Sequence, residues 1–226
     1  MKLPVISGAG DDGSACFGCT TPCCFEYVVP VNGHDLWRLT RALAVRWSSL
    51  VTVRTTPDDW AESFTLHRDG PRQAFLLRKQ PTGACALLMS LGPAHRCGVH
   101  ESRPLACRVY PLHSAWRAPT GVDFLAHALC PPPQRARFAA HKGALADAVL
   151  VELQERALHL RVVERWDEAA ALQPREQPFT VDDYVQWLLL AYDAIAPLRQ
   201  TNTHWTERAL TEIAKLSLPF QWAPGC

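Results

Sequence analysis

The sequence lacks the long apolar runs and the clustered positive charge of membrane proteins and nucleic-acid-binding proteins. No run of apolar residues approaches the about 18 that a membrane-spanning helix requires, so we predict no membrane partner. The formal net charge is only +1, and no basic block is interleaved with aromatic residues. Because a nucleic-acid-binding face concentrates positive charge, nucleic acid is not an expected partner either.

The first residues also lack the features of a secretory signal peptide. Residues 1–13 contain a single lysine, short apolar stretches and then Asp11 and Asp12. A signal peptide has a longer apolar core, so we predict a cytoplasmic protein. In the reducing cytoplasm, clustered cysteines are metal ligands more often than disulfides, and the odd total of nine cysteines fits a fully paired disulfide framework badly.

What the sequence does contain is an uneven distribution of cysteine. Eight of the nine cysteines lie between positions 16 and 130, and the series opens with Cys16-x2-Cys19-x3-Cys23-Cys24. Thiolates bind zinc and iron, usually four to a centre, so this set suits two such centres. The ninth cysteine, Cys226, is the last residue, and we interpret it as a thiol at a frayed chain end.

The adjacent pair Cys23 and Cys24 carries further information. Neighbouring side chains point to opposite faces of a strand and diverge by about 100° around a helix. Both sulfurs therefore cannot easily reach one small metal centre. If both are ligands, they serve two centres or two corners of one larger cluster. In the alternative interpretation, one of them is a buried thiol that packs as a small apolar group.

The spacing of the cysteines does not identify the metal. The pair Cys16-x2-Cys19 suits a tight turn, but a zinc site would normally repeat that pair about 12–20 residues later, and no such repeat occurs. The run C-x2-C-x2-C-x3-C of bacterial ferredoxins is also missing. The later cysteines stand singly, at Cys85, Cys97, Cys107 and Cys130.

Two further segments accompany the later cysteines. They are Gly83-Ala84-Cys85-Ala86-Leu87-Leu88 and Arg96-Cys97-Gly98-Val99-His100-Glu101-Ser102-Arg103-Pro104-Leu105-Ala106-Cys107-Arg108-Val109-Tyr110-Pro111. Together with the opening motif, they resemble the YkgJ-type cysteine-cluster family, which is described as a candidate zinc- or iron-chelating domain. The resemblance covers residues 14–133. The flagellin lysine methylase FliB, regarded as an iron–sulfur protein, has a similar cysteine arrangement.

The resemblance implies a ligand set and its surroundings. The family's cysteines correspond to Cys16, Cys19, Cys23, Cys24, Cys85, Cys97, Cys107 and Cys130. Arg103, Arg108 and Tyr110 match further positions of the last block, and we predict that they surround the bound group. Arginine suits that place because four thiolates on one Zn²⁺ leave a net negative charge. His100 stands where tyrosine is common, so its role stays open.

The resemblance implies metal binding, and we predict an iron–sulfur cluster, with 4Fe–4S favoured and zinc as the alternative. Two other functions stay open. One is a protein-modifying enzyme of the FliB type, with a protein substrate or partner, although Glu26 stands where a radical-type C-x3-C-x2-C run would need its third cysteine. The other is a thiol-redox or metal-delivery module in which Cys23 or Cys24 reacts.

Apolar periodicity predicts an α+β fold that is mostly α. We expect a cysteine-rich metal-binding region of loops and short strands at 14–133, packed against a helical region at 134–226 as part of one domain. Pro131-Pro132-Pro133 marks the change, because three fixed φ angles cannot belong to a helix interior. A strand pair is expected at 64–66 and 74–77. Apolar steps of three or four predict helices near 35–47, 145–173, 180–196 and 206–216.

Overall fold

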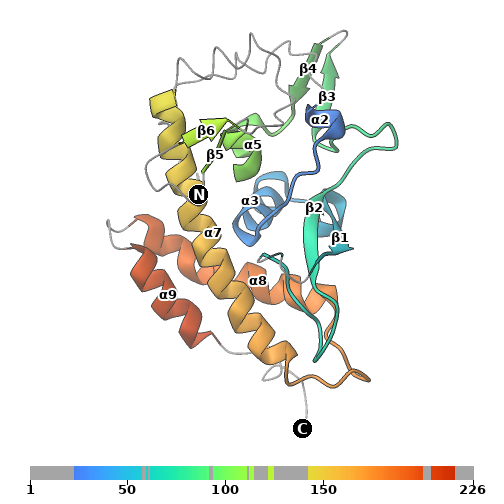
Figure 1. The fold of residues 1–226 in the computed structure, drawn as a ribbon, viewed down its shortest axis with the longest axis vertical. Coiled ribbons are helices and arrows are strands. Elements are labelled where there is room, and N and C mark those ends of the chain that lie inside the picture. Colours follow the sequence, from blue (N-terminus) through green and yellow to red (C-terminus); the bar gives the residue numbers. More distant parts are fainter. Residues whose placement is uncertain are drawn as a thin grey trace. The chain divides into compact units, whose positions relative to one another are not determined.

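The computed structural model describes residues 23–57, 60, 62–91, 94–110, 112–114, 122–124, 142–200 and 205–216. Helices account for more than half of these residues, and the strands within these ranges form three two-stranded sheets (Figure 1). The predicted α+β, mostly α, class is therefore confirmed. The boundary predicted at 131–133 lies outside the described residues and stays a prediction.

Contacts between residues divide the chain into two compact units. We call Met1–Val29 with Leu77–Leu153 the cysteine unit, and Pro30–Leu76 with Gln154–Cys226 the helical unit. Strands β1 and β2 are described below. The other elements, in chain order, are α2 (Cys23–Glu26), α3 (Gly33–Leu43), α4 (Trp47–Leu50), β3 (Leu88–Leu91), β4 (Ala94–Cys97), η1 (His100–Ser102), α5 (Leu105–Val109), β5 (Leu112–Ser114), β6 (Val122–Phe124), α7 (Lys142–Ala170), α8 (Val181–Ile195), η2 (Ala196–Gln200) and α9 (Trp205–Lys215). None of the helices described combines the length and apolar character needed to cross a membrane.

The four helices predicted from periodicity are present as α3, α7, α8 and α9. The start of α8 is fixed by a capping box. Thr180 Oγ1 accepts a hydrogen bond from the Asp183 N–H at 3.1 Å, and the Asp183 carboxylate accepts one from the Thr180 N–H at 2.8 Å. Helix α3 ends before its predicted limit at 47, because Ala44 adopts a left-handed conformation with φ of 52°.

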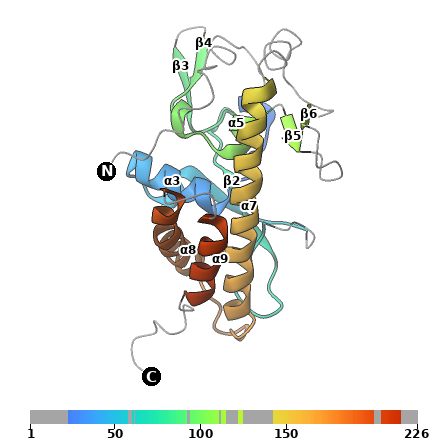
Figure 2. The same ribbon diagram turned by 90° about the vertical axis from the view of Figure 1, so that its left-hand side faces the viewer.

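The buried face of α8 supplies the core of the helical unit. This helix packs against α3 and against α9, which Figure 2 shows beside it. Aromatic rings pack against one another there: Phe64 and Tyr184 are stacked with centroids 3.8 Å apart, and Trp166 is tilted against Tyr184 with centroids 5.0 Å apart. Complete burial of a large apolar side chain contributes about 1.5–3 kcal/mol. The helical unit therefore has a substantial apolar core of its own.

Strand β1 (Val51–Thr55) pairs with β2 (Gln73–Leu77). The sequence predicts a different partner for β2, at 64–66. That contact is reduced to a single bridge between Phe64 and Gln73. Instead, Val31 donates its N–H to the Phe75 carbonyl at 3.0 Å, so the chain just before α3 also lies along β2.

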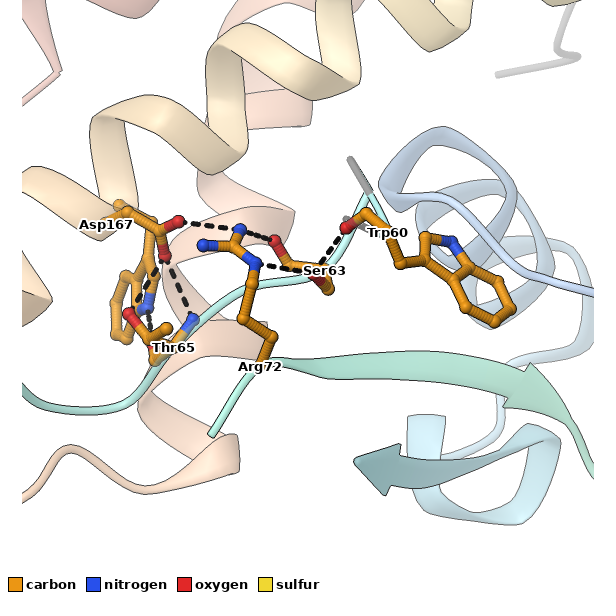
Figure 3. A network of polar contacts seen from close by, with 6 residues as sticks. Trp60, Ser63, Thr65, Arg72 and Asp167 are labelled. Atoms are coloured by element: carbon orange, nitrogen blue, oxygen red, sulfur yellow. Dashed lines mark hydrogen bonds and ion pairs between the residues drawn. The ribbon is translucent and has the colours of Figure 1, made fainter. Parts of the chain in front are cut away.

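A network of polar contacts holds the chain before β2 against α7 (Figure 3). The Arg72 guanidinium donates to the Asp167 carboxylate at 2.9 Å and to Ser63 Oγ at 2.6 Å. The second oxygen of Asp167 accepts from the Thr65 N–H at 2.9 Å, and Trp166 Nε1 donates to the Thr65 carbonyl at 2.6 Å. Because each of these polar groups has a hydrogen-bond partner, the network stabilises the fold instead of adding the penalty of unsatisfied polar groups.

The start of α3 packs closely on α7 and α8. A Cβ atom on Gly33 would lie 2.5 Å from Tyr192 Cε2 and 2.7 Å from Leu188 Cδ1, so only glycine fits there. The Gly33 N–H donates to Nδ1 of His159, which is 2% exposed. Burial outweighs the opposing hydrogen bond to the Glu62 carbonyl and lowers the pKa of His159 to about 4.

We predict that His159 makes the helical unit sensitive to mild acid. In the unfolded chain this histidine takes up a proton near its ordinary pKa of about 6.5, whereas in the folded chain it does so only near pH 4. Its contribution to stability is complete above pH 6.5 and is lost as the pH falls from 6.5 to 4, by up to about 3 kcal/mol. Urea unfolding followed by circular dichroism between pH 4 and 8 measures it. His159→Gln should flatten this part of the profile; an unchanged slope would contradict the assignment.

Candidate metal centre

The structure describes five of the eight predicted ligands. All five are partly buried, and no disulfide joins any two of them. Four separate segments carry them: Cys23 and Cys24 lie on α2, Cys85 precedes β3, Cys97 ends β4, and Cys107 lies in α5. The remaining three, Cys16, Cys19 and Cys130, lie outside the described residues.

The adjacent cysteines are held in one helical turn. Helix α2 spans only Cys23–Glu26, and the Tyr27 N–H closes it by donating to the Cys23 carbonyl at 2.9 Å. Consecutive side chains of a helix leave it about 100° apart. The side chains of Cys23 and Cys24 therefore leave this helical turn in different directions.

The backbone of Cys85 is tied to this turn. Its N–H donates to the Cys24 carbonyl at 2.7 Å, and it forms a bridge with Lys79. The Cys85 sulfur itself accepts a hydrogen bond from the Leu87 N–H at 3.4 Å. A donor aimed at sulfur stabilises the thiolate, which is the form in which cysteine binds a metal.

Strand pairing brings Cys97 toward Cys85. In the antiparallel hairpin of β3 and β4, Leu88 lies opposite Cys97. The N–H of Gly98 then donates to the Leu87 carbonyl at 2.8 Å. Because Leu87 and Leu88 follow Cys85 almost directly, the register of this hairpin determines how far apart these two cysteines lie.

Cys107 is positioned by a short helix with buried ends. Leu105 and Val109, at the two ends of α5, are 2% and 7% exposed. Arg108 donates from its guanidinium to the Glu101 carbonyl in η1, which ties the two short helices together. Cys107 thus lies on a turn that its neighbours anchor from both sides.

Aromatic contacts connect α2 to two of the other cysteine-bearing segments. Phe25 meets His95 of β4 edge to face, with ring centroids 5.5 Å apart. Tyr27 packs against Tyr110, which directly follows α5, with centroids 5.1 Å apart. The third such contact is the backbone hydrogen bond between Cys85 and Cys24. The turn is thus joined to each of the three other segments by one contact that does not involve sulfur.

The thiols influence one another electrostatically. A hydrogen bond with Cys23, then burial and the charges of three neighbouring thiols, raises the pKa of Cys24 far above its ordinary value. These neighbours are Cys23, Cys85 and Cys107. Burial raises the pKa of Cys85 as well, and Cys97 adds to the increase. Thiolates this close repel one another, so they do not all ionise unless a cation is bound among them.

The chemistry of the donor set fits zinc or an iron–sulfur cluster. Both are bound by thiolates, and hydrogen bonds to sulfur are common around iron–sulfur clusters. Within the described ranges, however, no three side chains of cysteine, histidine, aspartate or glutamate form a group that could hold a metal ion. A complete centre would therefore also need the predicted ligands outside those ranges, Cys16, Cys19 and Cys130.

The other residues predicted to surround the bound group lie on the segment that leads to and follows Cys107. Arg103 lies between η1 and α5. Arg108 bonds to η1 and Tyr110 packs on Tyr27, as described above. The His100 Nδ1 lies 3.7 Å from the carboxylate of Glu101. These contacts show how the segment is held. That Arg103, Arg108 and Tyr110 surround a bound metal or cluster stays a prediction.

Two residues of the centre were not singled out by sequence reasoning. Lys79 Nζ donates to the carbonyls of Cys24 at 3.1 Å and Phe25 at 2.9 Å. Gln80 Nε2 donates to the carbonyls of Cys85 at 3.0 Å and Leu88 at 3.2 Å. The available signal was the rarity of lysine: four of the 23 basic residues are lysines, and one of them lies shortly before a predicted ligand.

These observations describe a cysteine-rich region with the donor chemistry of a metal-chelating domain. Residues 15–124, just under half of the chain, match the sequence model of the CxxCxxCC family, described as a candidate zinc- or iron-chelating domain. This match agrees with the cysteine-cluster family that the motifs of the chain resemble. No curated protein and no solved structure shows a significant match to the chain.

We predict that Cys23 and Cys24 are both metal ligands. Replacing either by serine removes a soft donor, so Cys23→Ser and Cys24→Ser should each lower the metal content of the purified protein or change its absorption spectrum. Elemental analysis of anaerobically prepared protein provides the measurement, and Cys226→Ser, outside the cluster motif, is the matched control. If one of the two variants keeps the metal content and spectrum of the unchanged protein, that residue is a packing thiol.

Proposed function

We propose that the cysteine unit is an iron–sulfur module in which eight cysteines hold two centres, or one polynuclear cluster, with 4Fe–4S as the favoured type. The observation that carries the proposal is that four short segments place five thiols so that Cys24 interacts electrostatically with Cys23, Cys85 and Cys107, and Cys85 with Cys97, with no disulfide between any two of them. The match to a zinc- or iron-chelating family supports metal binding as such.

Apart from the start of α7, the elements in the described part of the cysteine unit are small, which supports a structural need for the bound group. Helices α2 and α5 have four and five residues, and β3 and β4 have four each. Elements this short are not stable by themselves and depend on what they pack against. A bound metal or cluster that links four segments converts its binding free energy into folding free energy.

The preference for iron–sulfur over zinc comes from the similarity of the cysteine arrangement to that of FliB, and the surroundings of the thiols are compatible with it. The N–H of Leu87 is aimed at the Cys85 sulfur, and Lys79 acts on the same thiol with its positive charge. Donors and cations near sulfur adjust the reduction potential of a cluster. When bound, such a cluster supplies reversible one-electron chemistry, whereas zinc supplies a redox-inert centre.

Metal analysis of anaerobically purified protein tests the proposal. We expect iron and acid-labile sulfide, with a broad visible absorption that disappears on addition of a chelator and an oxidant. Stoichiometric zinc in a colourless protein would overturn the iron–sulfur proposal but keep metal chelation. Three or four disulfides, found by counting thiols after denaturation in chelator without reductant, would contradict metal binding by these cysteines.

A further inference from the structure

Lys79 makes two hydrogen bonds to the turn that carries the adjacent cysteines. Its ammonium group donates to the carbonyls of Cys24 at 3.1 Å and Phe25 at 2.9 Å. Both carbonyls belong to α2, a single turn whose carbonyls after that of Cys23 need partners from outside the turn. Lys79 supplies a partner to two of them, and the Cys24 carbonyl also accepts the Cys85 N–H.

The backbone of Lys79 is paired with the segment of a third cysteine. Lys79 forms a bridge with Cys85, and the flanking Ala86 N–H donates to the Arg78 carbonyl at 2.9 Å. The next residue, Gln80, reaches the Cys85 carbonyl with its side chain at 3.0 Å. One short stretch of chain thus holds Cys85 through its backbone and the Cys23–Cys24 turn through its side chain.

The residue type suits this double contact. Of the 23 basic residues, 19 are arginines, yet a lysine stands here. An ammonium is a compact charge with three donors, so it can bond to two successive carbonyls of a tight turn, whereas the planar guanidinium of arginine is shaped for carboxylates and phosphates.

We propose that Lys79 is a positioning residue of the metal centre, which fixes the Cys23–Cys24 turn against Cys85. The inference rests on the proposed function because it takes the Cys23–Cys24 turn to be part of a metal centre. That Lys79 holds this turn against Cys85 can be measured in the protein without metal.

Zn²⁺ binding to the full-length, reduced, metal-free chain tests the role of Lys79, with a chromophoric chelator as competitor. Lys79→Met should weaken Zn²⁺ binding about tenfold, the lower end of the usual loss when a group supporting a metal ligand is removed. Lys79→Arg, which keeps the charge but not the compact geometry, should fall in between. Lys215→Met is the matched control, because Lys215 is an exposed lysine that pairs with Glu212 on α9. Equal affinity of Lys79→Met and the unchanged chain would overturn the proposal.

A second measurement does not require metal. In the metal-free chain, mass spectrometry gives the rate at which iodoacetamide labels each cysteine. Lys79→Met should speed the labelling of Cys23 and Cys24 several-fold, while Lys215→Met leaves it unchanged. Unchanged labelling would contradict the geometric role even if Zn²⁺ affinity falls. If Zn²⁺ does not bind to the unchanged chain, the labelling result alone decides the role of Lys79, while the analysis of iron and sulfide decides the proposed function. Where Lys79→Met does not fold by circular dichroism, Lys79→Gln, which keeps N–H donors without the charge, replaces it in both measurements.

Discussion

The crowding of thiols is the constraint on which the cysteine unit depends. Four short segments bring Cys23, Cys85 and Cys107 into electrostatic range of Cys24, and Cys97 into range of Cys85. Without a cation, burial and mutual repulsion keep such thiols protonated. On the proposed function, a bound cation would turn them into soft ligands. Lys79, Phe25 and Tyr27 make the contacts that hold the segments together.

The two units differ in the source of their order. The helical unit buries complete aromatic side chains such as Trp166, Trp187 and Tyr184, and the polar network of Arg72 and Asp167 satisfies its own hydrogen bonds. In the cysteine unit, the buried apolar residues of the described part are small or medium-sized, such as Ala84, Val99 and Leu105. Transfer of small side chains from water yields less free energy, so on the proposed function bound metal would have a larger share in stabilising that unit.

The sequence was sufficient for features that rest on local patterns. Helices α7 and α8 followed from apolar spacing and from Thr180 as a cap, because these signals act within a few residues. Strand β1 and the hairpin of β3 and β4 were not foreseen: they have five and four residues, and their partners are chosen by tertiary contacts. The extent of α3 was overestimated, since nothing in the sequence marks Ala44 as left-handed.

The same division between local patterns and tertiary contacts applies to the candidate centre. Its cysteines were recognisable as a motif, whereas for Lys79 the rarity of lysine was the only signal, because its bonds to the Cys24 and Phe25 carbonyls depend on how the chain folds.

Hydrogen exchange on the metal-loaded and the metal-free full-length protein tests the central claim most directly. If bound metal organises the cysteine unit, removing it should abolish protection at amides such as that of Cys85, which bonds to the Cys24 carbonyl. Amides of α8, in the middle of the aromatic core, should keep their protection. Equal protection of Cys85 in both forms would mean that the metal is peripheral to folding. An equal loss in both units would mean that they unfold as one cooperative structure, and either result would contradict the account.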